Sequence, residues 1–392
     1  MILIKFIFWI CLFLTCYTYV FYPVLLVVLS KIFKQKEFDP EQIVPNISII
    51  IAAYNEEKVI ESRIENCLRL DYPKEKLEII IASDGSNDGT CEIVRKYADQ
   101  GVALYEYKER RGKVNVLNDT VPKAKNEIIV LSDATTVFKA NSVMELVQQF
   151  RDERVGAICG KLAFDSIDDA GAGQLEGVYW KLESLIRRIE GRFGVLIGVT
   201  GAFYAIRKEL FVPCSKDTII EDFIIPMRIL EKGYKVVYEE KALAAEQVAK
   251  HIIQEKKRRI RIGSGDYQAL GMLKSMLDIR KGFSSFAFWS HKVIRWSVPF
   301  FMIVMFVLNM FLLKERLYLA IYALQCLFYT AAFVGQLLSW MGVNVKVFSL
   351  CYYFVSMNLA LWLGFLQFIA KKHSPTWEIA ERHIVDDDWS GK

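Results

Sequence analysis

Acidic residues stand at three points of this chain where a carboxylate could do chemistry. Asp84 follows an apolar run at 77–83, Asp133 follows another at 128–132, and the pair Glu221-Asp222 opens a third. Carboxylates at such places can accept hydrogen bonds from a base or a ribose, hold a divalent cation against phosphates, or take a proton from an attacking hydroxyl. We assign these roles as hypotheses to Asp84, Asp133 and Asp222 in that order.

Each position also has a structural alternative. Asp84 lies among turn-forming residues, although Asp88 fits the role of a helix cap better. Asp133 could simply begin the turn before the next helix, and Glu221-Asp222 could cap the helix that follows. The run Arg111-Gly112-Lys113 could cradle a phosphate or be a solvated basic turn. The local sequence favours function for Asp84 and leaves both interpretations of Asp133 open.

The elements that must position these residues alternate along the chain from Pro45 onward. We expect strands at 47–52, 77–83, 102–106, 128–132 and 155–164, and helices at 57–70, 88–97, 113–122 and 141–150. This alternation predicts an α/β domain with a largely parallel sheet. In such sheets ligands bind outside the carboxyl ends of the strands, which is where Tyr54, Glu56, Asp84 and Asp133 then fall.

Apolar segments flank this domain. The run at 2–29 is interrupted only by Lys5 and is long enough to span a bilayer, and three more follow at 297–313, 317–341 and 347–369. A cleaved signal peptide is the alternative for the first run, but a strongly basic start and a small-residue cleavage site are missing. The basic and apolar stretch at 256–277 and the aromatic stretch at 283–296 are typical of a membrane surface.

The charges and cysteines narrow the class of protein. Lys31, Lys34 and Lys36 outweigh Lys5, which predicts a cytoplasmic domain, although Lys371 and Lys372 conflict with four complete spans. The 8 cysteines contain no Cys-x-x-Cys pair, which favours a reducing compartment. A net charge of +5 without a basic face carrying interleaved aromatic residues argues against nucleic-acid binding.

With these residues in hand, the chain resembles the membrane-integrated family 2 glycosyltransferases, the group that includes cellulose, chitin, hyaluronan and poly-N-acetylglucosamine synthases. The resemblance runs from about Pro45 to Gln268. It is carried by the segment Ile49-Ile50-Ile51-Ala52-Ala53-Tyr54-Asn55-Glu56, by Ser83-Asp84-Gly85-Ser86 with Asp88-Gly89-Thr90, and by Gly112-Lys113 followed by Asn118. It implies a GT-A (Rossmann-like) fold that binds a nucleotide sugar through Ala53, Tyr54, Glu56, Asp84, Lys113, Asp133, Arg258 and Arg261.

Three departures from the family pattern matter. The family's Asp-x-Asp is Asp133-Ala134-Thr135 here, so Asp133 is expected to hold Mg²⁺ or Mn²⁺ without a second aspartate. The Thr-Glu-Asp motif is Ile220-Glu221-Asp222, which keeps the expected base Asp222 and its neighbour Glu221. The Gln-x-x-Arg-Trp motif aligns with Arg258 to Ile262, and Ile262 replaces the tryptophan that lines the acceptor channel of processive members. Gly201, Trp180 and Ile262 are the residues expected on the acceptor side.

The resemblance implies an inverting, metal-dependent transferase that moves a sugar from a nucleotide sugar, with UDP as the expected nucleotide, to a growing polysaccharide. Single-sugar transfer to a lipid-linked acceptor is the alternative, because the aromatic platform is missing. Tyr322, Gln325, Tyr329 and Gln336 could line a polysaccharide path or join membrane helices. Two alternatives come from other classes of protein. Asp84, Lys113, Asp222 and Arg261 argue against a non-catalytic nucleotide-sugar scaffold, and the size of the α/β region argues against a transporter.

The expected organisation has five parts: a membrane helix at 1–30, the glycosyltransferase domain at 40–270, an interface segment at 271–296, membrane helices at 297–370 and a tail at 371–392. The expected location is the inner (plasma) membrane, with several spans and the catalytic domain in the cytoplasm. Expected partners are a nucleotide sugar, a polysaccharide or lipid-linked acceptor, membrane lipid and an accessory membrane subunit, but no nucleic acid.

Overall fold

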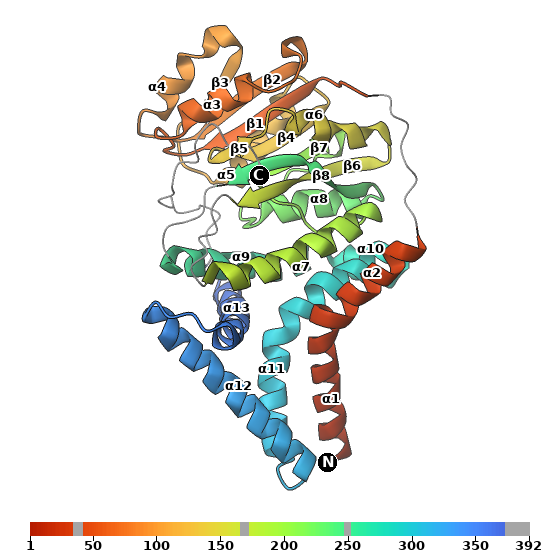
Figure 1. The fold of residues 1–392 in the computed structure, drawn as a ribbon. Coiled ribbons are helices and arrows are strands. Elements are labelled where there is room, and N and C mark those ends of the chain that lie inside the picture. The colour runs from red at the N-terminus through yellow and green to blue at the C-terminus, as the bar shows by residue number, and fades with distance from the viewer. Residues whose placement is uncertain (34–41, 165–171, 247–251, 373–392) are drawn as a thin grey trace.

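In the computed structural model, which describes residues 1–33, 42–164, 172–246 and 252–372, an α/β domain stands on a tapering group of apolar helices (Figure 1). The sheet has 8 strands in the order β3-β2-β1-β4-β7-β6-β8-β5. The strands are β1 Ile47–Ala53, β2 Leu77–Asp84, β3 Val102–Tyr107, β4 Ile128–Asp133, β5 Thr136–Phe138, β6 Val155–Phe164, β7 Phe203–Arg207 and β8 Lys235–Glu246. The α/β class is therefore confirmed.

The two halves of the sheet differ in strand direction. The half β3-β2-β1-β4 is parallel, as expected. In the other half β7 runs antiparallel to both β4 and β6, and β5 runs antiparallel to β8, while β6 and β8 are parallel. The expectation of a largely parallel sheet was wrong for this half, because β7 lies between β4 and β6 and runs opposite to both. The short strand β5 was not predicted.

The central strand β1 is buried along its whole length, which explains its unbroken run of isoleucines. Ile49 and Ile51 point into one core and Ile50 into the other, as the alternation of a strand requires. The helices that cover the sheet are α3 Ile60–Leu68, α4 Thr90–Arg95, α5 Lys113–Thr120, α6 Ser142–Val147, α7 Ala172–Arg192, α8 Glu221–Glu231 and α9 Ile252–Met272. Residues of α3 and α6 join the first core, and residues of α5, α8 and α9 join the second.

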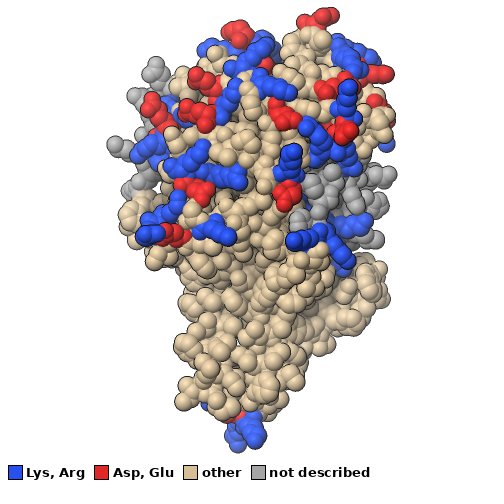
Figure 2. All heavy atoms as spheres, turned by 180° about the vertical axis from the view of Figure 1, so that it is seen from behind, with Lys and Arg blue, Asp and Glu red and all other residues tan. Residues whose placement is uncertain are grey.

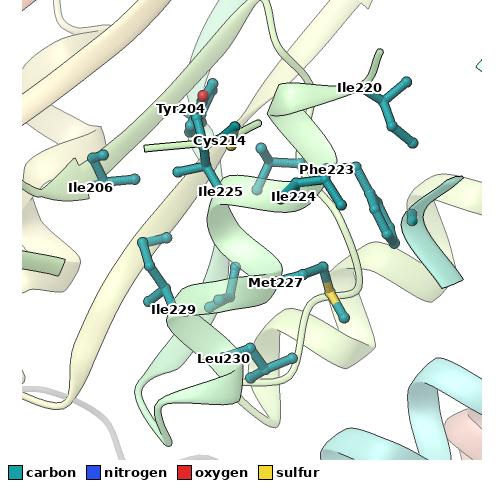
Figure 3. Close-up of a cluster of buried hydrophobic side chains, with 14 of the residues drawn as sticks. Tyr204, Ile206, Cys214, Ile220, Phe223, Ile224, Ile225, Met227, Ile229 and Leu230 are labelled. Carbon is teal, nitrogen blue, oxygen red and sulfur yellow. The ribbon is translucent and has the colours of Figure 1, made fainter. Parts of the chain in front are cut away.

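Helix α8 is fixed by the second core. Ile224, Ile225, Met227 and Ile229 are almost fully buried, and Figure 3 shows them in one cluster with Tyr204 and Ile206 of β7. Because this packing holds the helix along its length, the acidic first turn of α8 has a fixed position next to the end of the sheet.

Four helices are long and apolar enough to cross a membrane: Ile2–Ile32, Phe283–Met310, Arg316–Trp340 and Lys346–Ile369. The first comprises α1 Ile2–Cys16, a π-helical turn Tyr17–Phe21 and α2 Tyr22–Ile32. The second comprises α10 Phe283–Phe288, a π-helical turn Trp289–Val293 and α11 Ile294–Met310. The last two are α12 Arg316–Trp340 and α13 Lys346–Ile369. On the face shown in Figure 2, charged side chains cover the upper domain and return only at the lower tip.

The second of these helices begins at Phe283, whereas the expected start was near residue 297. Its first part contains His291, Lys292 and Arg295, which interrupt the apolar pattern in the sequence. These side chains face carboxylates of α7 rather than lipid, since His291 and Arg295 are buried against Glu183. Intramembrane charges paired in this way do not prevent a helix from continuing.

Helix α13 packs directly beneath α9. A Cβ atom on Gly364 would lie 2.7 Å from the backbone of Gly263 and Ser264, so only glycine allows this crossing. On the other side of the bundle, Phe306 of α11 stacks on Tyr322 and contacts Tyr329 of α12, with ring centroids 5.3 and 5.8 Å apart. These two tyrosines therefore join membrane helices.

Candidate active site

The carboxyl ends of β1, β2 and β4 lie side by side, because these strands are neighbours in the parallel half of the sheet. Hydrogen bonds join the loops that follow β1 and β2. The Asn55 amide nitrogen donates to Ser86 Oγ at 3.1 Å, and the Glu56 amide nitrogen donates to Thr90 Oγ1 at 2.9 Å. These contacts place Tyr54 and Glu56 beside the second loop, directly after the buried Ala53.

Asp84 is fully buried and holds the loop before α5. Its Oδ1 accepts from the Arg111 amide at 2.7 Å and its Oδ2 from the Gly112 amide at 2.8 Å. Burial raises the pKa of Asp84, and the two amide hydrogen bonds oppose that increase. Gly85 has a φ of +72°, and a Cβ there would lie 2.7 Å from the Arg110 nitrogen. Asp84 thus fixes the loop before α5 that contains Arg110 and Arg111, called the basic loop below. Direct contact of Asp84 with a nucleotide stays a prediction.

Asp88, in contrast, lies one residue before Gly89, the N-cap of α4, and it is not the cap that the sequence indicated. Its Oδ1 accepts from the Thr90 amide at 3.0 Å, at the start of α4. Its Oδ2 accepts from the Glu57 amide at 3.2 Å, which adds another link between the first two loops.

The basic loop reaches over the end of β1. The Arg110 guanidinium lies 4.0 Å from the centroid of the Tyr54 ring, and the Arg111 guanidinium lies 4.6 Å from that of Tyr107. Arg110 was not among the expected site residues. Its signal in the sequence was its position next to Arg111-Gly112-Lys113.

Lys113 begins α5, and its ammonium group joins two of the expected site carboxylates. The Nζ atom lies 2.6 Å from Asp133 Oδ1 and 3.3 Å from Glu221 Oε1. Burial opposes the charged form, but Asp133, Glu221 and Asp222 raise the pKa of Lys113 above its usual value. Burial also raises the pKa of Glu221, and Lys113 opposes that increase. Lys113, with 15% of its side chain exposed, therefore lies beside Asp133 and Glu221, and Asp222 also favours its charged form.

Asp222 lies on the side of this cluster that faces Gly201. The Gly201 amide donates to Asp222 Oδ2 at 3.2 Å, and a Cβ atom on Gly201 would lie 2.9 Å from the same oxygen. Gly201 lies in the loop before β7, and Asp222 in the first turn of α8. The structure thus brings together a predicted acceptor residue and the predicted base.

Helix α9 connects to the segment just before the acidic pair. Arg261 Nη1 donates to the Ile219 carbonyl at 3.1 Å, and Ile219 donates its amide to Gln268 Oε1 at the same distance. Arg258 is exposed, and Ile262 is half-buried against the second core. Trp180 lies on α7, but its side chain is outside the described part of the structure.

Carboxylate oxygens such as those of this site are suitable ligands for a divalent cation. Within the described ranges, no group of three or more His, Cys, Asp and Glu side chains is arranged to hold a metal ion. Asp133 keeps 35% of its side-chain surface exposed, whereas Glu221 keeps 11%. Mg²⁺ is commonly held by one or two carboxylates together with substrate phosphates. The residues present therefore fit an ion that arrives with a diphosphate and uses Asp133 as its protein ligand.

Two further residues near the base escaped the sequence interpretation. Arg187 of α7 donates from Nη1 to Thr200 Oγ1 at 2.6 Å, and Thr200 directly precedes Gly201. Asp266 of α9 has a pKa raised to about 8 by burial and by Asp222, with Lys292 opposing the increase. Neither belongs to a recognisable motif, so only the fold reveals them.

Comparison with known proteins agrees with this geometry. Residues 48–212 match the family model described as glycosyl transferase family 2. Poly-β-1,6-N-acetyl-D-glucosamine synthase of Staphylococcus aureus is 28% identical over 230 residues, which cover 57% of this chain and 55% of the relative. The enzyme of the same name from Staphylococcus epidermidis is 27% identical over 235 residues, covering 58% and 56%. The chain thus spans about half the length of the curated relatives it matches.

A solved structure shares the fold over nearly the whole chain. It is the mannosyltransferase PcManGT from Pyrobaculum calidifontis in complex with GDP-Man and Mn²⁺. The match has a TM-score of 0.68 at 21% identity and covers 94% of this chain and 100% of the other. The expected GT-A fold with membrane helices before and after it is confirmed.

Proposed function

We propose, from the match of residues 48–212 to the family 2 glycosyltransferase model, that this chain is an inverting, metal-dependent membrane transferase in polysaccharide assembly. The donor is a nucleotide sugar, with UDP as the proposed nucleotide. The acceptor hydroxyl belongs to a growing glycan that reaches the site from the membrane side.

The observation that carries this proposal is the meeting of Lys113, Asp133, Glu221 and Asp222 at the carboxyl edge of the sheet. Lys113 contacts Asp133 and Glu221 directly, and this cation with the three acidic residues can handle both the leaving diphosphate and the proton of the acceptor. The basic loop at Arg110 and Arg111 adds positive charge over Tyr54, where the nucleotide is expected.

Asp133 is the proposed ligand of Mg²⁺ or Mn²⁺, which would neutralise negative charge on the departing diphosphate. The Lys113 ammonium contacts Asp133, and it can also interact with the phosphate oxygens of the donor when the donor binds. Arg261 is proposed as a second basic side chain, after Lys113, that contacts the diphosphate. Helix α9 holds it next to the segment that precedes Glu221.

Asp222 is the proposed general base. It takes the proton of the acceptor hydroxyl while the hydroxyl oxygen bonds to the anomeric carbon and the bond to the diphosphate breaks. One displacement of this kind inverts the anomeric configuration. The Gly201 amide, which donates to Asp222 Oδ2, fixes the carboxylate for this reaction.

Transfer of a single sugar to a lipid-linked acceptor is a second candidate, and Ile262 favours it. This side chain packs against the second core and offers no aromatic face on which a long glycan could stack. Tyr322 and Tyr329 pack on Phe306, which supports a role in joining helices over a role in lining a polysaccharide path.

We also propose that the α/β domain faces the cytoplasm from the inner membrane. Lys31 flanks the first span on the domain side, and Lys5 at the other end is paired with Glu315 at 2.6 Å. The proposed domain boundaries and an accessory membrane subunit remain predictions.

The experiment that tests this function is product analysis. The purified protein in lipid is incubated with radiolabelled UDP sugars and Mn²⁺ or Mg²⁺, and the products are separated by size. A labelled glycan or glycolipid of inverted configuration is expected. Absence of incorporation from every UDP sugar, with UDP binding intact, would contradict the proposed donor and reaction.

A further inference from the structure

A buried arginine lies behind the carboxyl end of β4. Arg63 belongs to α3 and is only 2% exposed. Within the described residues, its hydrogen-bond partners are the neutral side chains of Asn66 and Ser132. A charged group buried against neutral partners is costly, and an apolar side chain would fill the same space at a lower cost. The hydrogen bonds of Arg63 therefore indicate a task beyond packing.

The guanidinium of Arg63 is held in one orientation. Its Nη1 atom donates to Asn66 Oδ1 at 2.7 Å, and its Cζ atom lies 4.0 Å from the centroid of the Phe138 ring. Asn66 is fixed in turn by the backbone of β5. Its Oδ1 accepts from the Phe138 amide at 2.9 Å, and its Nδ2 donates to the Phe138 carbonyl at 2.8 Å. The second terminal nitrogen of Arg63 therefore has a fixed direction.

That second nitrogen contacts β4 on the face of the sheet opposite the candidate active site. Successive side chains of a strand point to opposite faces, so Ser132 faces α3 while Asp133 faces α5. On the first face, Arg63 Nη2 donates to Ser132 Oγ at 2.9 Å. On the other face, Lys113 Nζ lies 2.6 Å from Asp133 Oδ1. Two cations thus contact neighbouring residues of β4 from opposite sides.

Arg63 determines where the hydrogen of the Ser132 hydroxyl points. A guanidinium has donors only, so Ser132 Oγ accepts from Arg63 and keeps its one hydrogen for another acceptor. The Ala202 carbonyl oxygen lies 2.8 Å from Ser132 Oγ and receives that hydrogen. Both residues are buried, so water does not compete for this hydrogen bond. Arg63 therefore acts, through Ser132, on the loop that leads into β7.

This loop, residues 198–202, is called the Gly201 loop. It contains two glycines, and Gly198 has a φ of +85°, so its own residues give it little rigidity. The Gly201 amide donates to Asp222 Oδ2 at 3.2 Å. Because Ala202 is the next residue, a shift of its carbonyl would move the Gly201 amide. The link from Arg63 therefore ends at the proposed base.

We propose that Arg63 is a positioning residue for sugar transfer, which fixes the Gly201 loop through Ser132 and so aligns the Asp222 carboxylate with the acceptor hydroxyl. Arg63 lies on the far face of the sheet and contacts neither the donor site nor Asp222, so it acts only through this link. The inference rests on the proposed function. Slow hydrolysis of the donor by water needs no aligned acceptor, so loss of the link should impair transfer far more than hydrolysis.

The test compares Arg63→Met, Ser132→Ala and the double variant with the wild type, as purified full chains in lipid. Each receives Mn²⁺ and the radiolabelled UDP sugar that yields product in the assay above. Label in glycan or lipid is separated from free sugar released into water. We expect each single variant to transfer at least about tenfold more slowly, with hydrolysis within about threefold of the wild-type rate. Ser132→Ala removes one oxygen atom, so it provides the test if Arg63→Met does not fold.

The double variant shows whether Arg63 acts through Ser132. Both changes break the same link, so the double variant should transfer within about twofold of the slower single variant. Multiplied losses would overturn the proposal. Equal losses of transfer and hydrolysis in the single variants would also overturn it, because they would show damage to the whole site.

Arg207→Met is the matched control. Arg207 also lies over a phenylalanine ring, 5.1 Å from the centroid of Phe150, and donates to the Val155 carbonyl at 2.9 Å. It pairs with Ile128 at the amino end of β4, away from the candidate active site. Arg207→Met should leave the ratio of transfer to hydrolysis unchanged. A change as large as that of Arg63→Met would show that general loosening of the sheet is the cause, and would overturn the proposal.

Hydrogen exchange separates failure of this inference from failure of the proposed function. Exchange of a peptide covering Gly201 should be at least about fivefold faster in Arg63→Met and Ser132→Ala than in the wild type or Arg207→Met. Exchange at the wild-type rate in both variants contradicts the inference, whether or not sugar is transferred. Faster exchange without transfer from any UDP sugar by the wild type contradicts the proposed function and leaves the link from Arg63 to the Gly201 loop standing.

Discussion

Replacing Lys113 by methionine should destabilise the protein because two carboxylates lose their shared cation. Glu221 is the more important of the two because only 11% of its side chain is exposed, although its 3.3 Å contact is longer than that of Asp133. Breaking a buried ion pair from one side typically costs about 3–5 kcal/mol. Asp133 keeps 35% exposure and is stabilised by water, so we expect a loss below this range, about 2–3 kcal/mol near pH 8.

The cost of Lys113→Met should depend on pH. Burial raises the pKa of Glu221 in the folded state, and Lys113 limits that increase. Without Lys113 the folded protein holds this proton to higher pH than the unfolded chain. Stability is then retained below the unfolded pKa and lost as pH rises through the folded one. The difference between variant and wild type should therefore grow as pH rises above the usual pKa of a glutamate.

Thermal unfolding in detergent, followed by tryptophan fluorescence, measures this effect. A loss of about 2–3 kcal/mol corresponds to a decrease in Tm of about 4–12 °C for a domain of about 200 residues. Lys125→Met is the control, because Lys125 is 84% exposed and lies 3.7 Å from Glu78. The double variant Lys113→Met/Glu221→Gln should recover at least half of the loss. Equal Tm values for the two lysine variants at pH 8, or no recovery, would refute the reasoning.

Three further predictions concern the same site. EDTA should stop transfer and excess Mn²⁺ should restore it, if Asp133 holds a cation with the donor; undiminished transfer in EDTA would remove that role. Gly201→Ala should lower kcat about tenfold or more with donor affinity unchanged, because its Cβ would lie 2.9 Å from Asp222 Oδ2. Gly271→Ala is the control, because a Cβ atom on this helical glycine would have no neighbour within 4 Å. It should leave kcat unchanged. Burial raises the pKa of Asp266 to about 8, so wild-type stability should fall between about pH 4 and pH 8. Asp266→Asn should flatten that part of the Tm profile, and parallel profiles would contradict the assignment.

The parallel half of the sheet could be predicted from the sequence, because its signals are local. The runs before Asp84 and Asp133 contain enough β-branched residues to mark buried strands, and β2 and β4 end within a residue of the expected positions. Since parallel strands end at one edge of the sheet, the approach of these two loops followed from the strand assignment alone.

The contacts inside the site could not be predicted, because they join distant parts of the chain. No local pattern states that Lys113 will contact both Asp133 and Glu221, or that Arg187 will reach Thr200. The antiparallel strand β7, which carries Gly201 toward Asp222, follows from pairing with β4 and not from its own sequence.

The early start of the second span was hidden for a related reason. Hydropathy treats His291, Lys292 and Arg295 as costs to membrane insertion. In the fold Glu183 and Glu190 of α7 pair with these side chains, and the helix continues from Phe283 without a break. A local hydropathy window cannot detect ion pairs between residues that are more than a hundred positions apart in the sequence.

The most direct test of the central claim is sugar transfer by Asp222→Asn beside the wild type. Donor affinity and initial transfer rate are measured on the same preparations in lipid, with the exposed Asp99→Asn as a control. If Asp222 is the general base, its variant should bind the donor as the wild type does and transfer at least about 100-fold more slowly. Transfer within about threefold of the wild-type rate would contradict the assignment of Asp222 as the base.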